Sequence, residues 1–466
     1  MVFCANMGGI VATLRDPVSK PPSSHTIFVR ETAVVVHLAT SNMNEIDLRQ
    51  LLDRANEAEK VERNYEHAQQ LYKTVLAHTP LPSETPTFHE IHLQARERLA
   101  SLLSLMGQQK EALAQLETYQ TEAHTRAEKT KALALIGQLL TTMGRLSEAL
   151  QKQQEALLLA TDLDTASQAL AHLGMGNVLY QSGRLEEALA SFEKALPGFV
   201  QAGDQEQQLR VRNWQGMAYA RLGQTDKSIK AFQEGLRLAR QIGERAASVL
   251  LNNLGEAYQN LFDMEQALIY HEEGMQLAES TQLASNMADL ARNLGVDLVY
   301  LGRMEEGIAY LYRALSISEE TGQVVMKLQT LYSLALAEAQ QGNWTMAQTH
   351  AQVLLELAQE KKARAYEADA LHALGVCYKE QGAIAQAEQA WQQASFLAHE
   401  TEQRMLLWQI HAELAEAAMD DGLADVHRRI AAEVIEQIVY PIADKKLREK
   451  FLNAPAVKAV MAANAE

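Results

Sequence analysis

The sequence predicts an all-α solenoid built from antiparallel helix pairs. Three observations lead to this fold class: small residues recur at a nearly constant period, proline is almost absent from the middle of the chain, and glycine marks regular turns. The 466 residues include nine prolines, of which only Pro197 lies between Pro86 and Pro441. Because proline breaks helix interiors, so long a stretch with one proline suits an array of helices.

The period appears first in a series of Gly and Ala residues spaced 37 to 40 residues apart. The series comprises Ala100, Gly137, Gly176, Gly216, Gly255, Gly295, Ala335, Gly375 and Ala415. Self-similarity at such a period is the signature of a stacked repeat architecture. We expect each of these residues in the first helix of a pair, where the second helix crosses closely.

A second series lies seven residues further along and consists of glycine in every unit but one. It comprises Gly107, Gly144, Gly183, Gly223, Gly302, Gly342, Gly382 and Gly422, with Phe262 in the remaining unit. Glycine readily takes the left-handed conformation that ends a helix. The series therefore predicts the turn between the two helices of each pair.

A third series of small residues follows five positions later, in the expected second helix. It comprises Ala112, Ala149, Ala188, Ser228, Ala267, Gly307, Ala347 and Ala387, and fails at His427. A large apolar residue comes a turn later at Phe192, Phe232, Leu311 and Trp391. One helix pair cannot bury such a seam alone, so the pairs are expected to stack.

These motifs resemble tetratricopeptide repeats (TPRs), most closely in "GNVLYQSGRLEEALASFEKAL" from Gly176 and "LGVCYKEQGAIAQAEQAWQQA" from Leu374. The resemblance covers residues 45–440 and implies a right-handed superhelical solenoid of about ten repeats. The period of about 40 residues exceeds the usual 34 and resembles kinesin light chain and the TPR regions of bacterial signalling ATPases and transcription regulators. The extra residues are expected between one pair and the next, in stretches such as "RQIGERAAS" and "EETGQVVMK". Another helical-pair repeat, such as HEAT, could share the period, but the three linked series favour TPR.

The two ends of the chain fit no repeat. Residues 1–44 include the β-branched stretch "TIFVRETAVVVHLAT", for which a short β-hairpin and a poorly ordered tail are both open, and we favour the tail. Residues 441–466 predict capping helices, with an apolar face through Leu447 and Phe451 and a break at Pro455.

Composition restricts the partners and the compartment. The 42 Lys and Arg against 59 Asp and Glu give a net charge of −17, which disfavours direct binding of nucleic acid and of anionic membrane surfaces. The two cysteines, Cys4 and Cys377, form no disulfide framework, and no apolar run reaches the roughly 20 residues of a membrane span. We expect a cytoplasmic protein.

No catalytic motif is present in the sequence. There is no phosphate-binding loop, no nucleophile elbow and no paired-histidine zinc motif, so we expect neither enzymatic activity nor a cofactor. His89 and His92 are three residues apart, which a metal site permits, but without an evident third ligand we interpret them as surface histidines and expect no metal.

In TPR superhelices the first helices line a concave groove, and the resemblance assigns ten residues here to a peptide-binding groove. They are Arg210, Asn213, Trp214, Arg221, Asn252, Asn253, Asn260, Asp289, Arg292 and Asn293. A ladder of Asn side chains can donate to and accept from a peptide backbone, arginine can pair with a carboxylate, and Trp214 can anchor an apolar side chain. In the alternative, these Asn side chains bond to neighbouring repeats, and Arg292 pairs with Asp289 or Glu256.

The resemblance implies a non-catalytic scaffold that binds a protein or an extended peptide. The alternative is a sensor or regulatory module of a bacterial signalling system whose effector domain is absent or separate. The two-carboxylate clamp of chaperone-binding TPRs is not expected, because Leu173 and Trp214 stand where its Lys and its next Asn belong.

Overall fold

The computed structural model describes residues 43–60, 64–79, 85–242, 244–281 and 284–463, and these residues form helices and turns without strands. The expected hairpin or tail at residues 1–44 lies almost wholly outside this described part. The helices fall into two compact units, which meet in the sequence between Gly203 and Asp204. The periodic series run across this boundary without interruption.

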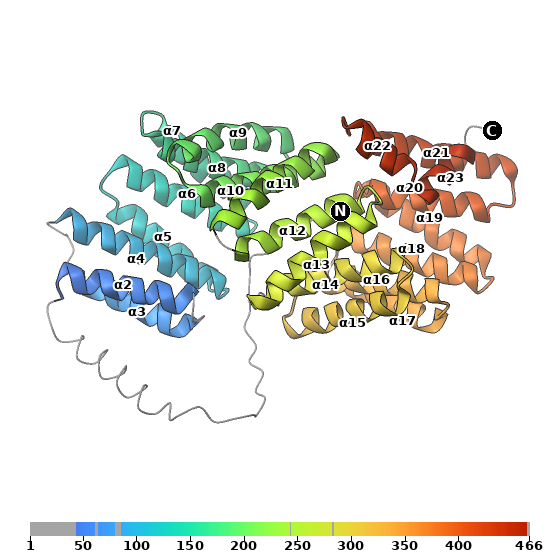
Figure 1. Ribbon diagram of the computed structural model, residues 1–466, viewed down its shortest axis with the longest axis horizontal. Coiled ribbons are helices and arrows are strands. Elements are labelled where there is room, and N and C mark those ends of the chain that lie inside the picture. The colour runs from blue at the N-terminus through green and yellow to red at the C-terminus, as the bar shows by residue number, and fades with distance from the viewer. Residues whose placement is uncertain (1–42, 61–63, 80–84, 243, 282–283, 464–466) are drawn as a thin grey trace, which may run out of the picture. The chain divides into compact units, whose positions relative to one another are not determined.

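The first unit consists of four helix pairs, drawn from blue to green in Figure 1. Its helices are α2 (Glu45–Lys60), α3 (Tyr65–His78), α4 (Pro86–Leu105), α5 (Gln109–Glu122), α6 (Arg126–Thr142), α7 (Leu146–Ala160), α8 (Thr165–Gln181) and α9 (Leu185–Gln201). Each helix packs against the next one along the chain, as expected of stacked hairpins.

The second unit continues the pattern with six pairs and two short final helices. The pairs comprise α10 (Gln205–Arg221), α11 (Thr225–Ile242), α12 (Glu244–Gln259), α13 (Met264–Ser280), α14 (Ala284–Tyr300), α15 (Met304–Glu320), α16 (Val324–Gln341), α17 (Trp344–Glu360), α18 (Arg364–Glu380), α19 (Ile384–Glu400), α20 (Arg404–Ala417) and α21 (Asp421–Val439). The last two helices, α22 (Lys445–Leu452) and α23 (Pro455–Ala463), pack on α21.

The long period comes from long helices. Helices α14 and α15 have 17 residues each, and three-residue turns follow both of them. The expectation that the extra residues form connections between pairs is wrong. Most of "EETGQVVMK" belongs to the end of α15 and the start of α16, because the left-handed Gly322 lets the chain reverse within three residues.

The predicted turn glycines are confirmed in seven pairs. Their φ angles are positive, between 72° and 86°, at Gly107, Gly144, Gly183, Gly223, Gly302, Gly342 and Gly382. The prediction for Gly422 is wrong: this residue lies in the first turn of α21, and the chain leaves α20 instead through an extended Ala418. Phe262 takes the left-handed conformation that glycine takes elsewhere, with φ at +58°.

The close crossing of paired helices is also confirmed. A Cβ added to Gly176, Gly216 or Gly375 would lie within 3.0 Å of the ring sixteen residues later. Those rings belong to Phe192, Phe232 and Trp391. The missing side chain of one helix is therefore the space that the large side chain of the other helix fills. In the pair of Ala335 the residue sixteen positions later is Ala351. Here alanine replaces the glycine of the other pairs, and a second alanine replaces their ring.

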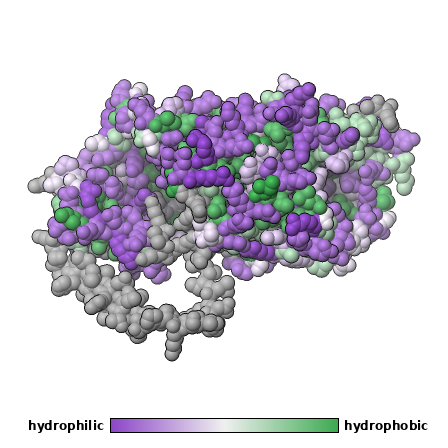
Figure 2. Space-filling model, in the orientation of Figure 1, coloured by the Kyte–Doolittle hydropathy of each residue, from purple (hydrophilic) through white to green (hydrophobic). Residues whose placement is uncertain are grey.

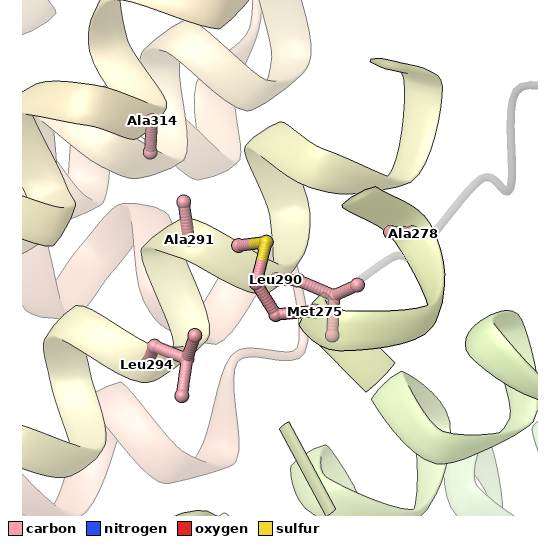
Figure 3. Close-up of a cluster of buried hydrophobic side chains, with 6 residues drawn as sticks. All are labelled: Met275, Ala278, Leu290, Ala291, Leu294 and Ala314. Carbon is pink, nitrogen blue, oxygen red and sulfur yellow. The ribbon is translucent and has the colours of Figure 1, made fainter. Parts of the chain in front are cut away.

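Cores between pairs are continuous along each unit. In Figure 3, Met275 and Ala278 of α13 meet Leu290, Ala291 and Leu294 of α14, together with Ala314 of α15. All six are buried, so each pair covers the seam of the next one. The face shown in Figure 2 is mostly hydrophilic, with scattered apolar patches.

Candidate functional site

The first helices of successive pairs form the inner side of the second unit. Contacts join α10 to α12, α12 to α14, α14 to α16 and α16 to α18. Among the described residues, no comparable contacts join the second helices, α11, α13, α15, α17 and α19. A stack in which one set of helices lies closer together curves toward that set, so the first helices lie on its inner side.

Asparagine side chains bridge three of these inner helices. The amide of Asn253 on α12 donates to Oδ1 of Asn213 on α10 over 2.8 Å. The amide of Asn293 on α14 donates to Oδ1 of Asn252 on α12 over 2.9 Å. These Asn side chains therefore bond to one another across neighbouring repeats, which is the alternative that the sequence left open.

Two carboxylates join the ladder at α12 and α14. Asn252 donates to Asp289 at 3.0 Å, and Asn293 donates to Oε1 of Glu256 at 3.1 Å. The guanidinium of Arg292 lies 3.4 Å from Asp289 and 3.6 Å from Glu256. We call these five residues, Asn252, Glu256, Asp289, Arg292 and Asn293, the amide–carboxylate cluster.

Burial gives the cluster its electrostatic character. Asn293 is fully buried, while Asn252 and Arg292 are 6% and 8% exposed. Burial raises the pKa of Glu256 to about 7, and the negative charge of Asp289 acts in the same direction. Two carboxyl groups here face one guanidinium, so the cluster would accommodate a further positive charge.

A second polar layer lies behind the cluster. Nδ1 of His271 is 2.6 Å from Oδ2 of Asp297, and both side chains are fully buried. Gln259 donates to Asp297 at 2.7 Å and to the backbone oxygen of Asn293 at 3.1 Å. These bonds hold the backbone that carries Asn293. The sequence signal for this layer is His271 itself, because it fills the space beside Gly255 that an aromatic ring fills in three other pairs.

The remaining candidates lie on α10 and at the end of α12. Arg210 donates to Gln207 at 3.4 Å, and burial lowers its pKa. Trp214 and Asn260 are half-buried, whereas Arg221 is exposed. Hydrogen bonds thus link Asn213 to Asn253, Asn252 to Asn293 and Asp289, and Asp289 to Arg292.

Further polar residues follow along the inner helices. The hydroxyl of Tyr332 on α16 lies 3.0 Å from Nδ1 of His372 on α18. Burial lowers the pKa of His372 to about 4. Asp369 accepts a hydrogen bond from Gln403 at 3.1 Å, and burial raises its pKa to about 7. Our sequence analysis missed Asp369 and His372, since nothing in their local pattern separates them from surface positions.

The expectation that His89 and His92 are surface histidines is wrong. Both side chains are buried in the first unit. Nδ1 of His92 lies 2.6 Å from Oγ1 of Thr79, and its Nε2 lies 3.2 Å from Glu122, which Arg96 also contacts. The pair thus belongs to a polar contact between α4 and its neighbours.

Among the described helices, none is long and apolar enough to cross a bilayer.

Comparisons with known proteins agree with this geometry. A tetratricopeptide-repeat family model matches residues 129–201, 207–280 and 286–360. No curated protein matches the chain. Among solved structures, the apo form of RapI is 16% identical, with a TM-score of 0.51, and covers 58% of this chain and 98% of its own. A Rap protein complexed with Competence and Sporulation Factor is 14% identical, with a TM-score of 0.50, and covers 74% of this chain and 99% of its own.

At these identities the likeness concerns the fold alone. The matched family model covers pairs in both units, and the described helices reproduce the paired arrangement with its turn glycines and close crossings. On these grounds, the chain contains tetratricopeptide repeats within residues 129–360, and its described helices share the paired fold of such repeats.

Proposed function

We propose that the second unit binds an extended segment of another protein, or a peptide, along its inner helices, at the Asn213–Asn253 pair and the amide–carboxylate cluster. The observation that carries this proposal is the pair of amide–amide hydrogen bonds on the inner helices, one between α10 and α12 and one between α12 and α14. A side-chain amide that bonds to another amide can exchange that bond for one to a peptide backbone, because it both donates and accepts. The half-buried pair of Asn213 and Asn253 is the best placed for such an exchange.

The charges of the cluster favour a ligand that carries a basic group. Arg292 already lies beside Asp289 and Glu256, so it is a poor partner for an acidic ligand. A lysine or arginine side chain, or a free amino terminus, would balance the second carboxylate and lower the pKa of Glu256. Trp214, one helix away on α10, offers an apolar surface for a neighbouring side chain.

A regulatory role is the second candidate. Rap proteins share the fold, and one of them is complexed with Competence and Sporulation Factor, which supports the idea that such a stack can receive a signalling factor. In that case binding at the inner side would change how the chain acts on a second protein. The two candidates share the binding step and differ in whether that step alters a further interaction.

The binding step can be tested with purified full-length protein and a displayed library of unstructured peptides. We expect enrichment of peptides with a basic residue, and loss of their binding in the variant Asn253→Ala/Asp289→Asn. The matched control is Gln276→Ala/Glu272→Gln, which likewise removes one side-chain amide and neutralises one carboxylate, but at exposed positions on α13. Equal binding by both variants, or no enriched peptide, would remove the inner side as the binding surface.

A further inference from the structure

An aromatic cluster joins the end of the second unit to one of its early turns. The ring of Phe262, in the turn between α12 and α13, lies 5.5 Å from the ring of Phe451 on α22. It also lies 6.1 Å from Tyr300 and 6.4 Å from Trp408 on α20. Phe451 is fully buried and Trp408 is 2% exposed, whereas Phe262 is half-buried and Tyr300 lies at the exposed edge of the cluster.

Two more contacts accompany the rings. Nζ of Lys450 lies 3.0 Å from Oδ1 of Asp263, the residue after Phe262. Pro441 lies against the preceding turn, since a Cβ added to Gly223 would be 3.4 Å from its Cγ. The segment from Pro441 to Phe451 therefore touches the turns of the first two pairs of this unit, although about 190 residues separate Phe262 from Phe451 in sequence.

The conformation of Phe262 shows that this position serves the contact and not the turn. Its φ of +58° is unfavourable for a side chain with Cβ, by roughly 1–2 kcal/mol, and seven other pairs use glycine there. Lys362 and Glu402 also have positive φ angles, but they are exposed and lie between pairs. At Phe262 the strain is offset by packing against three other aromatic rings.

In a solenoid each repeat ordinarily contacts only its neighbours, so small rotations between pairs are free to change the curvature. A contact between the two ends of the six-pair stack removes that freedom. We propose that the segment from Pro441 to Phe451 is a clasp that holds residues 204–463 in a closed turn. In this clasp, Pro441 contacts Gly223, while Lys450 and Phe451 contact Asp263 and Phe262. Opening the clasp widens the spacing across the stack.

The clasp can be tested by measuring a distance across the unit in the full-length chain. Nitroxide spin labels are placed at Lys230→Cys on α11 and Met419→Cys before α21, both exposed, with Cys4 replaced by Ser. Phe262→Gly removes the ring while keeping a residue that suits the turn. We expect a longer and broader distance distribution in this variant, with unchanged helicity. Lys362→Gly, which changes another residue of positive φ outside the clasp, is the matched control and should leave the distribution as it is.

A charge exchange gives a second arm that does not truncate the core. Lys450→Glu should add a longer population, and Lys450→Glu/Asp263→Lys should restore the original distribution. Lys445→Glu, on the same helix but paired with Glu449 of that helix, should have no effect. If Phe262→Gly and Lys450→Glu both keep the original distance, α22 merely covers the end of α21 and the clasp is wrong. The outcome does not depend on the binding function proposed above, because no ligand is present.

Discussion

The amide of Asn293 donates to Oδ1 of Asn252 and, from the same nitrogen, to Oε1 of Glu256, so that one fully buried side chain joins α14 to two residues of α12. An asparagine with these two bonds holds neighbouring repeats together whether or not a ligand is bound. Asn253 is different, because it is half-buried and its bond joins it to Asn213, which is also half-buried. Binding and stability can therefore be separated by choosing between the two.

Replacing Asn293 by alanine should lower the stability more than replacing Asn253. The buried Asn252 would lose a donor, which costs about 1–3 kcal/mol for an unsatisfied buried group, whereas the half-buried Asn213 can be hydrated. Urea unfolding followed by circular dichroism measures the difference. Asn260→Ala, which changes a half-buried residue directly after α12, serves as the control. Its unfolding free energy should stay within about 0.5 kcal/mol of wild type. Equal losses at Asn253 and Asn293 would contradict the bridging role of Asn293.

Neutralising Glu256 should stabilise the protein in a pH-dependent way. The pKa of this carboxyl is raised from 4.5 to about 7, so the folded chain binds the proton more tightly than the unfolded chain. Ionisation therefore costs stability, and this cost is absent below about pH 4.5 and complete above about pH 7. We expect Glu256→Gln to have a higher Tm than wild type at pH 8 and a nearly equal Tm at pH 5.

Differential scanning calorimetry at the two pH values measures this difference. Glu272→Gln, at an exposed position on α13, is the control for a general loss of negative charge. A Tm difference for Glu256→Gln that is the same at both pH values would contradict the raised pKa.

A methyl group at Gly375 should be far more damaging than one at Gly302. The new Cβ at Gly375 would meet the fully buried ring of Trp391, and such overpacking costs about 1–3 kcal/mol or more. At Gly302 nothing lies within 4 Å, so Gly302→Ala costs only the strain of its φ of +80°, roughly 1 kcal/mol. Chemical denaturation of both variants tests the order of the two losses.

The same position allows a double-mutant cycle. Gly375→Ala/Trp391→Ala should be less destabilised than the sum of the two single changes, because truncating the ring leaves space for the new methyl group. The chain itself has this combination at Ala335 and Ala351. Additive losses would show that the two residues do not share a space.

Glycine at Lys362 or Glu402 should stabilise the protein. Both residues are exposed and have positive φ angles, of 54° and 57°, which glycine adopts without the Cβ penalty. Each change should raise the unfolding free energy by up to about 1 kcal/mol, less the greater entropy of glycine in the unfolded chain. Thermal unfolding is the measurement, and Lys361→Gly, in the last helical turn before Lys362, should lower the Tm instead.

Features that repeat could be predicted from the sequence, and features that occur once could not. The turn glycines and the crossing of Gly375 by Trp391 follow from local rules that every pair must satisfy. The contact of Phe262 with Phe451 joins distant segments, and its only sequence signal is the interruption of the glycine series at Phe262.

The candidate site lies between these two cases. The resemblance to TPRs assigned Asn252, Asn253 and Asn293 to the inner helices, and the 40-residue period carries each position to the same side of the next pair. Spacing could not reveal that these amides bond to one another, because that depends on side-chain rotamers and on the carboxylates of Glu256 and Asp289. The polar layer behind them was missed for the same reason, although His271 departs visibly from its aromatic equivalents.

The matched glycine and ring within each pair have a consequence for how the array can change length. A ring such as Trp391 fits only a helix that leaves space at one position, and the alanine of a different pair would collide with it. Exchanging single helices between pairs would therefore break the fit, whereas copying or deleting both helices of a pair together would keep it. A helix pair is thus the smallest segment that can be duplicated or deleted while every remaining glycine keeps its matching ring.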